Sequence, residues 1–307
     1  MSTPTRVVLD CDTANEIDDQ IAIAHALGSP SLDILGVISV QNTVAHGRAS
    51  RDLYQDEAIR VVDLCGRASD VPCLPGADQP MENTRTAVLS EGLDFLIQAA
   101  EAGPVTLLAT GPATDIASLA LTAPHVLDQL SVVWAGGFPD SATWQRKKFG
   151  ELNARADIAA WRRLFLDPVP LRVLPGWPGV ETVALPWREC VDRFRCLHRP
   201  ITDYLADIVE RYAAERGVSL DMDDDRAAEM KVIWDIVNVA ALTRPDAVTF
   251  IRQQLPSVDP AGVPDWTVPG RQADVGLDVD AVAVLEDLWA ALERLPEAIS
   301  PEQGVRR

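Results

Sequence analysis

Short apolar runs of strand length alternate with segments of helical periodicity along most of the chain. The runs are rich in Val, Ile and Leu, and segments with an apolar residue every three to four positions follow most of them. Strands are predicted at 7–9, 32–40, 105–110, 130–135 and 171–174. Helices are predicted at 18–27, 44–65, 93–102, from 111 onward, over most of 186–216, at 230–242 and at 279–295. This alternation predicts an α/β fold with a doubly wound, mainly parallel central sheet and helices on both faces.

The length of the chain and its patterning favour a single domain over residues 1–307. With 307 residues and 47% hydrophobic content, the chain can bury a large core. It carries no internal repeat, low-complexity segment or clear linker. The tail from Pro245 onward, with its final helix, is expected to complete the same domain.

Carboxylates gather where the first predicted strand gives way to the first helix. Asp10 and Asp12 follow the apolar run 7–9, and because side chains alternate along a strand, these two point the same way. Asp18 and Asp19 begin the helix, where negative charge suits the helix dipole. Two strand-end carboxylates therefore face two helix-start carboxylates.

Such a cluster needs a neutralising partner. Unit charges a few ångströms apart repel by about 4 kcal/mol per pair at an intermediate dielectric. A hard cation removes that repulsion, and oxygen ligands without Cys or His favour Ca²⁺ or Mg²⁺ over zinc. The alternative is that Asp18 and Asp19 only cap the helix while Asp10 and Asp12 lie in a solvated loop. That alternative leaves the strand-end pair unexplained.

The first strand and helix resemble a known family signature. A strand ending in D-x-D at Asp10 and Asp12, followed by D-D at Asp18 and Asp19, is similar to the amino-terminal signature of the inosine-uridine-preferring nucleoside hydrolases. The chain departs from the common spacing by two extra residues and lacks the usual glycine; DTANEIDDQ is a recurrent variant. The resemblance implies a nucleoside-hydrolase-like fold and metal-dependent cleavage of the N-glycosidic bond of a ribonucleoside or related riboside. It implies Ca²⁺ as the cofactor, with Mg²⁺ as second choice.

The resemblance also assigns roles to individual residues. Asp12 is the expected general base, and Asp10 supports it. The family carries G-x-x-T-N after the third predicted strand, here Gly111 to Asp115, so the Thr114 carbonyl is carried over as a metal ligand. The expected cation ligands are Asp12, Asp19, Thr114 and Asp235. The expected substrate contacts are Asp18, Asn42, Glu151, Asn153 and Trp234. For Asn42 a simple turn role is equally open.

Trp234 is the main departure from the family pattern, because it occupies the position of a histidine that precedes the metal-binding aspartate. Contacts to the leaving base are then expected from two loops, 76–86 and 198–226. Candidate side chains there and nearby also fit surface or packing roles; they are Arg85, Trp144, His198, Arg211, Tyr212 and Arg226.

Two other functions compete with this hypothesis. LDCDT also matches the D-x-D motif of haloacid-dehalogenase-type phosphatases, with Asp10 as nucleophile and Asp12 as acid and base. That fold needs a downstream lysine and a second acidic pair after a strand, but the chain has only Lys147, Lys148 and Lys231, and the acidic run 223–225 follows no strand. A non-catalytic sugar-binding or nucleoside-binding relative is the other alternative, because Trp234 removes the usual acid.

The charge and the cysteine content of the chain limit the classes of binding partner and the cellular compartment that we expect. A formal net charge of -19 argues against nucleic acid and against an anionic membrane. No apolar run reaches membrane-spanning length, and no signal-like apolar segment precedes the first strand. Five cysteines without a C-x-x-C pair predict a reduced, cytoplasmic protein. The expected partner is a small ribonucleoside or riboside, and the resemblance implies a homodimer or homotetramer.

Overall fold

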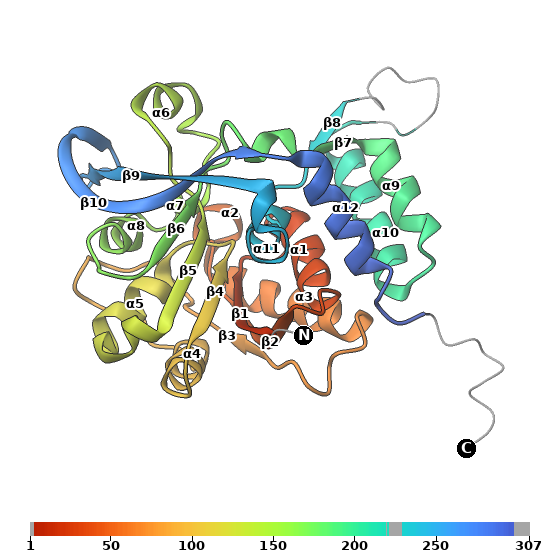
Figure 1. Cartoon of the computed structure of the whole chain (residues 1–307), viewed down its shortest axis with the longest axis horizontal. Coiled ribbons are helices and arrows are strands. Elements are labelled where there is room, and N and C mark those ends of the chain that lie inside the picture. Colours follow the sequence, from red (N-terminus) through yellow and green to blue (C-terminus); the bar gives the residue numbers. More distant parts are fainter. Residues whose placement is uncertain (1–2, 219, 221–228, 298–307) are drawn as a thin grey trace.

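A twisted eight-stranded sheet forms the centre of the computed structural model, which describes residues 3–218, 220 and 229–297 (Figure 1). The strand order is β3-β2-β1-β4-β5-β6-β10-β9. The strands of this sheet are β1 (Thr5–Cys11), β2 (Leu32–Ser39), β3 (Cys73–Pro75), β4 (Val105–Ala109), β5 (Leu130–Ala135), β6 (Leu171–Leu174), β9 (Val248–Val258) and β10 (Pro264–Val279). All neighbours pair in parallel except β9 and β10, which are antiparallel. A separate two-stranded sheet pairs β7 (Ala184–Pro186) with β8 (Met230–Val232).

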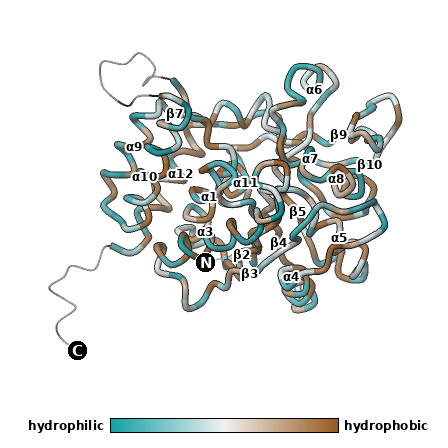
Figure 2. Tube along the Cα trace, turned by 180° about the vertical axis from the view of Figure 1, so that it is seen from behind, coloured by the Kyte–Doolittle hydropathy of each residue, from teal (hydrophilic) through white to brown (hydrophobic). Residues whose placement is uncertain are grey.

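The helices cover both faces of the sheet, which confirms the predicted doubly wound α/β fold. The longer helices are α1 (Asp18–Leu27), α3 (Ser50–Leu64), α4 (Glu91–Glu101), α5 (Thr114–Thr122), α9 (Trp187–Cys196), α10 (Pro200–Glu215), α11 (Ile236–Thr243) and α12 (Ala281–Leu292). The shorter ones are α2 (Thr43–His46), α6 (Ser141–Lys147), α7 (Asn153–Ala156) and α8 (Ile158–Leu164). Alternation along β1 assigns Val7 and Leu9 to one core and Val8 to the other. Figure 2 shows hydrophilic and hydrophobic residues alternating along α9 and α10, as expected for helices with one face in the core.

The chain order of the strands reverses between β1 and β4. From β1 the chain moves outward through β2 and β3, and it then returns to the other side of β1 for β4. Such a reversal opens a crevice at the carboxyl ends of the two strands, where open α/β sheets bind ligands. Asp12 follows β1 and Thr110 follows β4, so both border this crevice.

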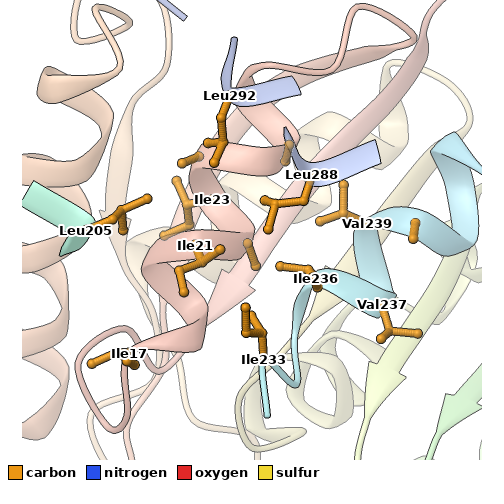
Figure 3. Packing of buried hydrophobic residues seen from close by; sticks show 14 of the residues in the cluster. Ile17, Ile21, Ile23, Leu205, Ile233, Ile236, Val237, Val239, Leu288 and Leu292 are labelled. Atoms are coloured by element: carbon orange, nitrogen blue, oxygen red, sulfur yellow. The ribbon is translucent and has the colours of Figure 1, made fainter. Parts of the chain in front are cut away.

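An apolar core fixes α11 against α1 (Figure 3). Ile21 and Ile23 of α1 lie beside Ile233 and Ile236 at the start of α11, with Leu288 of α12 closing the group. All five side chains are fully buried. Because this core locks the amino-terminal ends of α1 and α11 together, it holds Asp18 and Asp19 close to Asp235.

The structure corrects three sequence predictions. The segment 44–65 is two helices, α2 and α3, separated near Gly47, whose φ of 69° interrupts the helix. The segment 230–242 is strand β8 followed by α11, so Asp235 is the N-cap of a helix rather than a charge inside one. The tail after Pro245 contains the long β9 and β10 ribbon, which extends the sheet past β6. Figure 1 shows this ribbon reaching out to α6 and α8.

The acidic run 223–225 and Arg226 lie outside the described residues. Within the described part of the chain, no helix is long and apolar enough to cross a membrane.

Candidate active site

A pocket lies at the carboxyl ends of the central strands, on the crevice between β1 and β4. Its lining residues lie at or just after the ends of β1, β4, β5 and β6 and near the start of α1 and α11. Of the residues expected from the sequence, seven line it: Asp12, Asp18, Asp19, Glu151, Asn153, Trp234 and Asp235. Asp10, Asn42 and Thr114 are buried but do not line this pocket.

Three carboxylates converge at the bottom of the pocket. Asp18, Asp19 and Asp235 each present an oxygen, and these oxygens lie within 4.8 Å of one another. Asp12 adjoins them, and its Oδ2 accepts hydrogen bonds from Asn42 Nδ2 at 2.7 Å and Asn15 Nδ2 at 3.1 Å. The two amides fix the orientation of the Asp12 carboxylate.

Burial makes this cluster costly to ionise without a cation. Burial, opposed in part by the hydrogen bond from Asn42, raises the pKa of Asp12 to about 7. Burial also raises the pKa of Asp18 to about 6, against the attraction of Lys231. The pKa values of Asp19 and Asp235 rise well above the ordinary range, first through burial and then through neighbouring carboxylates. A hard divalent cation fits this all-oxygen donor set, because it would offset both the desolvation and the mutual repulsion.

Thr110, rather than Thr114, stands beside the acidic cluster. Thr114 is buried in the first turn of α5, and its hydroxyl donates to Asp157 Oδ2 at 2.8 Å. Thr110 lies four residues earlier in the chain and lines the pocket. Its hydroxyl donates to Asp19 Oδ1 at 2.6 Å. Of the two threonines, Thr110 lines the pocket and Thr114 does not, and the role of the Thr114 carbonyl as a metal ligand stays a prediction.

Asn153 and Glu151 line the same pocket as the acidic cluster. Asn153 Nδ2 donates to the carbonyls of Thr110 at 2.6 Å and Ala135 at 2.9 Å, tying the ends of β4 and β5 together. Glu151 accepts from the backbone N–H groups of Gly137 and Ala154. Burial, opposed by these backbone hydrogen bonds, raises the pKa of Glu151 to about 7.

Asn42 and Asp10 act behind the pocket rather than in it. Asn42 caps α2 by accepting from the Ala45 N–H, and its amide donates to Asp12. Both oxygens of Asp10 lack a hydrogen-bond partner among the described residues. Burial and the nearby charges of Asp115 and Asp12 raise the pKa of Asp10 well above its usual range. Asp10 thus lies behind the pocket, close enough to Asp12 for the charges of the two carboxylates to interact.

Two indoles form the aromatic wall of the pocket. Trp234 and Trp177 meet edge to face, with ring centroids 5.9 Å apart. Phe138 stacks on Trp177 from behind, and Lys147 lies over the Trp177 ring at 5.2 Å. Trp177 follows β6 in a segment that carried no sequence signal for binding. The loop candidates Arg85, Trp144, His198, Arg211 and Tyr212 do not line this pocket.

Comparison with known proteins identifies the family. Residues 7–286 match the family model described as inosine-uridine preferring nucleoside hydrolase. The chain belongs to this family. Its activity class is hydrolysis of the N-glycosidic bond of a ribonucleoside, and the phosphatase interpretation of the D-x-D motif is set aside.

Individual relatives agree with this placement. The chain is 26% identical to a pyrimidine-specific ribonucleoside hydrolase RihA of Shewanella woodyi, over 94% of this chain and 97% of the relative. It is 28% identical to a RihA of Photobacterium profundum, over 68% of this chain and 71% of the relative. The fold is similar to an inosine-guanosine nucleoside hydrolase (TM-score 0.74, 16% identity, covering 95% and 99% of the two chains). It is also similar to the plant nucleoside hydrolase PpNRh1 (TM-score 0.73, 18% identity, covering 94% and 99%).

The nucleoside hydrolase also contains an ion pair at its pocket that the sequence did not reveal. Lys231 of β8 is 4% exposed, and its Nζ lies 3.0 Å from Glu16 Oε2. Glu16 lines the pocket within the turn between β1 and α1. The backbone N–H of Trp234 also donates to Asp18. These two contacts join the Asp-rich turn to the segment that carries Trp234 and Asp235. Only the tertiary fold brings Glu16 and Lys231 together, so no local pattern could show the pair.

Proposed function

We propose that this nucleoside hydrolase uses Ca²⁺ and that Asp12 is its general base. The observation that carries the proposal is the convergence of Asp18, Asp19 and Asp235 beside an Asp12 oriented by two amides. Asp12, Asp19, Asp235 and the Thr114 carbonyl would hold the cation. When bound, a divalent cation lowers the pKa of water and orients oxygen ligands.

The residues of the chain supply the remaining chemistry. Asp12 lies within hydrogen-bonding reach of Asp19 in the acidic cluster. Asn42 and Asn15 both donate to its Oδ2, so its other oxygen is free of those two amides and can take a proton from the attacking water. Departure of the base leaves oxocarbenium character on the sugar, which the surrounding carboxylates stabilise electrostatically. Asp18, Glu151 and Asn153 hold the ribose hydroxyls, and Trp234 and Trp177 hold the base.

The test is a panel of ribonucleosides assayed with calcium and with chelator. Release of free ribose only in the presence of the cation supports the proposal. Release that is equally fast with chelator contradicts the metal role, and no release from any ribonucleoside or activated riboside contradicts the catalytic role.

Calcium is expected to raise the melting temperature, and more at pH 8 than at pH 5. Burial raises the pKa values of Asp12 and Asp18 above those of the unfolded chain, so the folded protein binds more protons between about pH 4 and 7. The metal-free protein therefore loses stability as pH rises through this window, while the ionised cluster binds calcium better. At one hundred times its Kd, a ligand adds about 2.7 kcal/mol, or several degrees.

Differential scanning fluorimetry at both pH values, with and without calcium, measures this effect. Asp235→Ala should abolish the calcium response, and Asp33→Ala, at an exposed position of β2, should keep it. A response that is absent in the wild type, or that survives in Asp235→Ala, is incompatible with the proposed site.

Asn153→Ala should weaken all accepted ribonucleosides by a similar factor. Asn153 lines the pocket with Glu151, and its amide donates to the carbonyls of Thr110 and Ala135. These four residues lie on the ribose side of the proposed complex. Because ribose is common to every substrate, the loss in kcat/KM should be uniform, about 10- to 100-fold. Steady-state kinetics on a purine and a pyrimidine ribonucleoside test this; a loss confined to one of them would place Asn153 beside the base.

A non-catalytic nucleoside-binding protein is the second candidate function. Trp234 favours it, because the indole supplies no acid. One protein of similar fold is the type III effector protein XopQ, in a structure complexed with adenosine diphosphate ribose (TM-score 0.67, 16% identity). Binding of a ribonucleoside with no turnover would favour this candidate.

Location and assembly are further parts of the proposal. All five cysteines are free, which suits a reducing, cytoplasmic compartment. A homodimer or homotetramer is carried over from the family resemblance.

A further inference from the structure

Asn238 forms part of the pocket floor and was not selected by any sequence motif. It lies three residues after Asp235 in α11, so both side chains stand on one face of the helix. The residue is 1% exposed, and it lines the pocket together with Thr110 and Asp235.

The orientation of the Asn238 amide is fixed by its partners. Nδ2 donates to the carbonyl of Ala109 at 3.2 Å and to the carbonyl of Val133 at 3.2 Å. Carbonyls only accept, so the group facing them must be the amide nitrogen, and Oδ1 is the free end. Within the described part of the chain, Oδ1 has no hydrogen-bond partner. A buried acceptor without a donor is costly, which points to a donor that arrives with the ligand.

We propose that Asn238 Oδ1 accepts a hydrogen bond from an O–H group bound in the pocket, either water or a ribose hydroxyl. This inference rests on the proposed function, because the acidic cluster and its cation would bring such oxygens to the floor. An oxygen drawn to a cation turns its hydrogens away from the cation, and those hydrogens need acceptors.

An amide oxygen suits this position better than another carboxylate. The Thr110 hydroxyl already donates its hydrogen to Asp19. A primary amide accepts a hydrogen bond without taking the proton, so it orients the O–H group and leaves proton transfer to Asp12. It also adds no charge to a floor that already holds Asp18, Asp19 and Asp235. Asn238 is thus a positioning residue for the oxygens of the site.

Two binding titrations separate the two sources of the O–H group. Calcium is titrated into metal-free protein by calorimetry without sugar, and ribose is titrated into protein saturated with calcium. Asn238→Leu removes the acceptor at similar volume and is expected to weaken one of the two affinities by roughly 3- to 10-fold. A loss in the calcium titration identifies water, and a loss confined to ribose identifies a sugar hydroxyl.

Two further variants complete the experiment. Asn238→Asp keeps an oxygen at the same place and adds a negative charge, so it should bind calcium more tightly than the wild type. Gln253→Leu is the matched control, because it removes a carboxamide that donates to the Pro139 carbonyl away from the pocket. It should leave both affinities unchanged.

One result would overturn the inference: Asn238→Leu binds calcium and ribose as tightly as the wild type does, and only the melting temperature of the metal-free variant falls. That result would give Asn238 only a structural role, as a hydrogen-bonded link between β4 and β5. If Asn238→Leu does not fold, a calcium affinity of Asn238→Asp identical to that of the wild type overturns it instead. A wild type that binds neither calcium nor ribose overturns the proposed function itself.

Discussion

Replacing Asp12 by asparagine is expected to lower kcat by about 10³- to 10⁴-fold at saturating calcium, the upper part of the range for losing a general base. The side chain keeps its shape, so the contacts with Asn42 and Asn15 change little in geometry. An amide cannot take a proton from water, and this is the step that the buried, oriented carboxylate performs in the proposed mechanism.

The experiment must separate loss of the base from loss of the cation. Calcium affinity of Asp12→Asn is measured first, and kcat is then compared with the wild type at a concentration that saturates both. Asn42→Ala serves as the companion variant, since it leaves the carboxylate and removes only one of its supports. We expect it to lose far less activity than Asp12→Asn. An Asp12→Asn enzyme within tenfold of the wild type, with the cation bound, would assign the base to another residue.

The parallel part of the fold was predictable because its strands are buried on both faces. Such strands are short continuous apolar runs, and the predicted 130–135 and 171–174 coincide with β5 and β6. The β9 and β10 ribbon was missed because much of β9 is exposed and the run carries Arg252, Gln253 and Gln254. Its stability comes from pairing along its length, which periodicity over a short window does not reveal.

The segment 230–242 shows a different limit. MKVIWDIVNVAAL is apolar enough for either a strand or a buried helix, and composition alone cannot place the boundary. In the structure, Lys231 pairs with Leu185 of β7, and Asp235 then occupies the N-cap position of α11. The boundary depends on a strand partner more than forty residues earlier in the chain.

The candidate site was predictable where a motif and a strand end coincided. Asp12, Asp18, Asp19, Glu151, Asn153 and Asp235 all line one pocket, because the carboxyl ends of parallel strands meet at one edge. That Thr110 lines the pocket and Thr114 does not depends on the turn between β4 and α5, since both threonines lie near the same strand end. Trp177 and Asn238 carried no motif, and only their positions in space mark them.

Trp234 is expected to limit cleavage of ordinary nucleosides. Its indole forms the aromatic wall with Trp177, so it can hold a flat base. The indole N–H is not acidic near neutral pH, so it cannot protonate the departing base as a histidine could. We expect kcat/KM on inosine and uridine to fall below ~10⁴ M⁻¹s⁻¹, with faster turnover of ribosides whose leaving groups depart readily as anions, such as p-nitrophenolate.

Trp234→His should then raise kcat/KM on inosine or uridine by about 10²-fold, the lower end of the gain from a positioned acid. The gain should be much smaller on the p-nitrophenyl riboside, because that leaving group needs no proton. Trp234→Phe is the matched control, since it keeps an aromatic face against Trp177 and adds no titratable group. It should leave the contrast between inosine and the activated riboside unchanged. Wild-type turnover of inosine or uridine at ~10⁴ M⁻¹s⁻¹ or more, with no gain in Trp234→His, would show that another group of the pocket activates the leaving base.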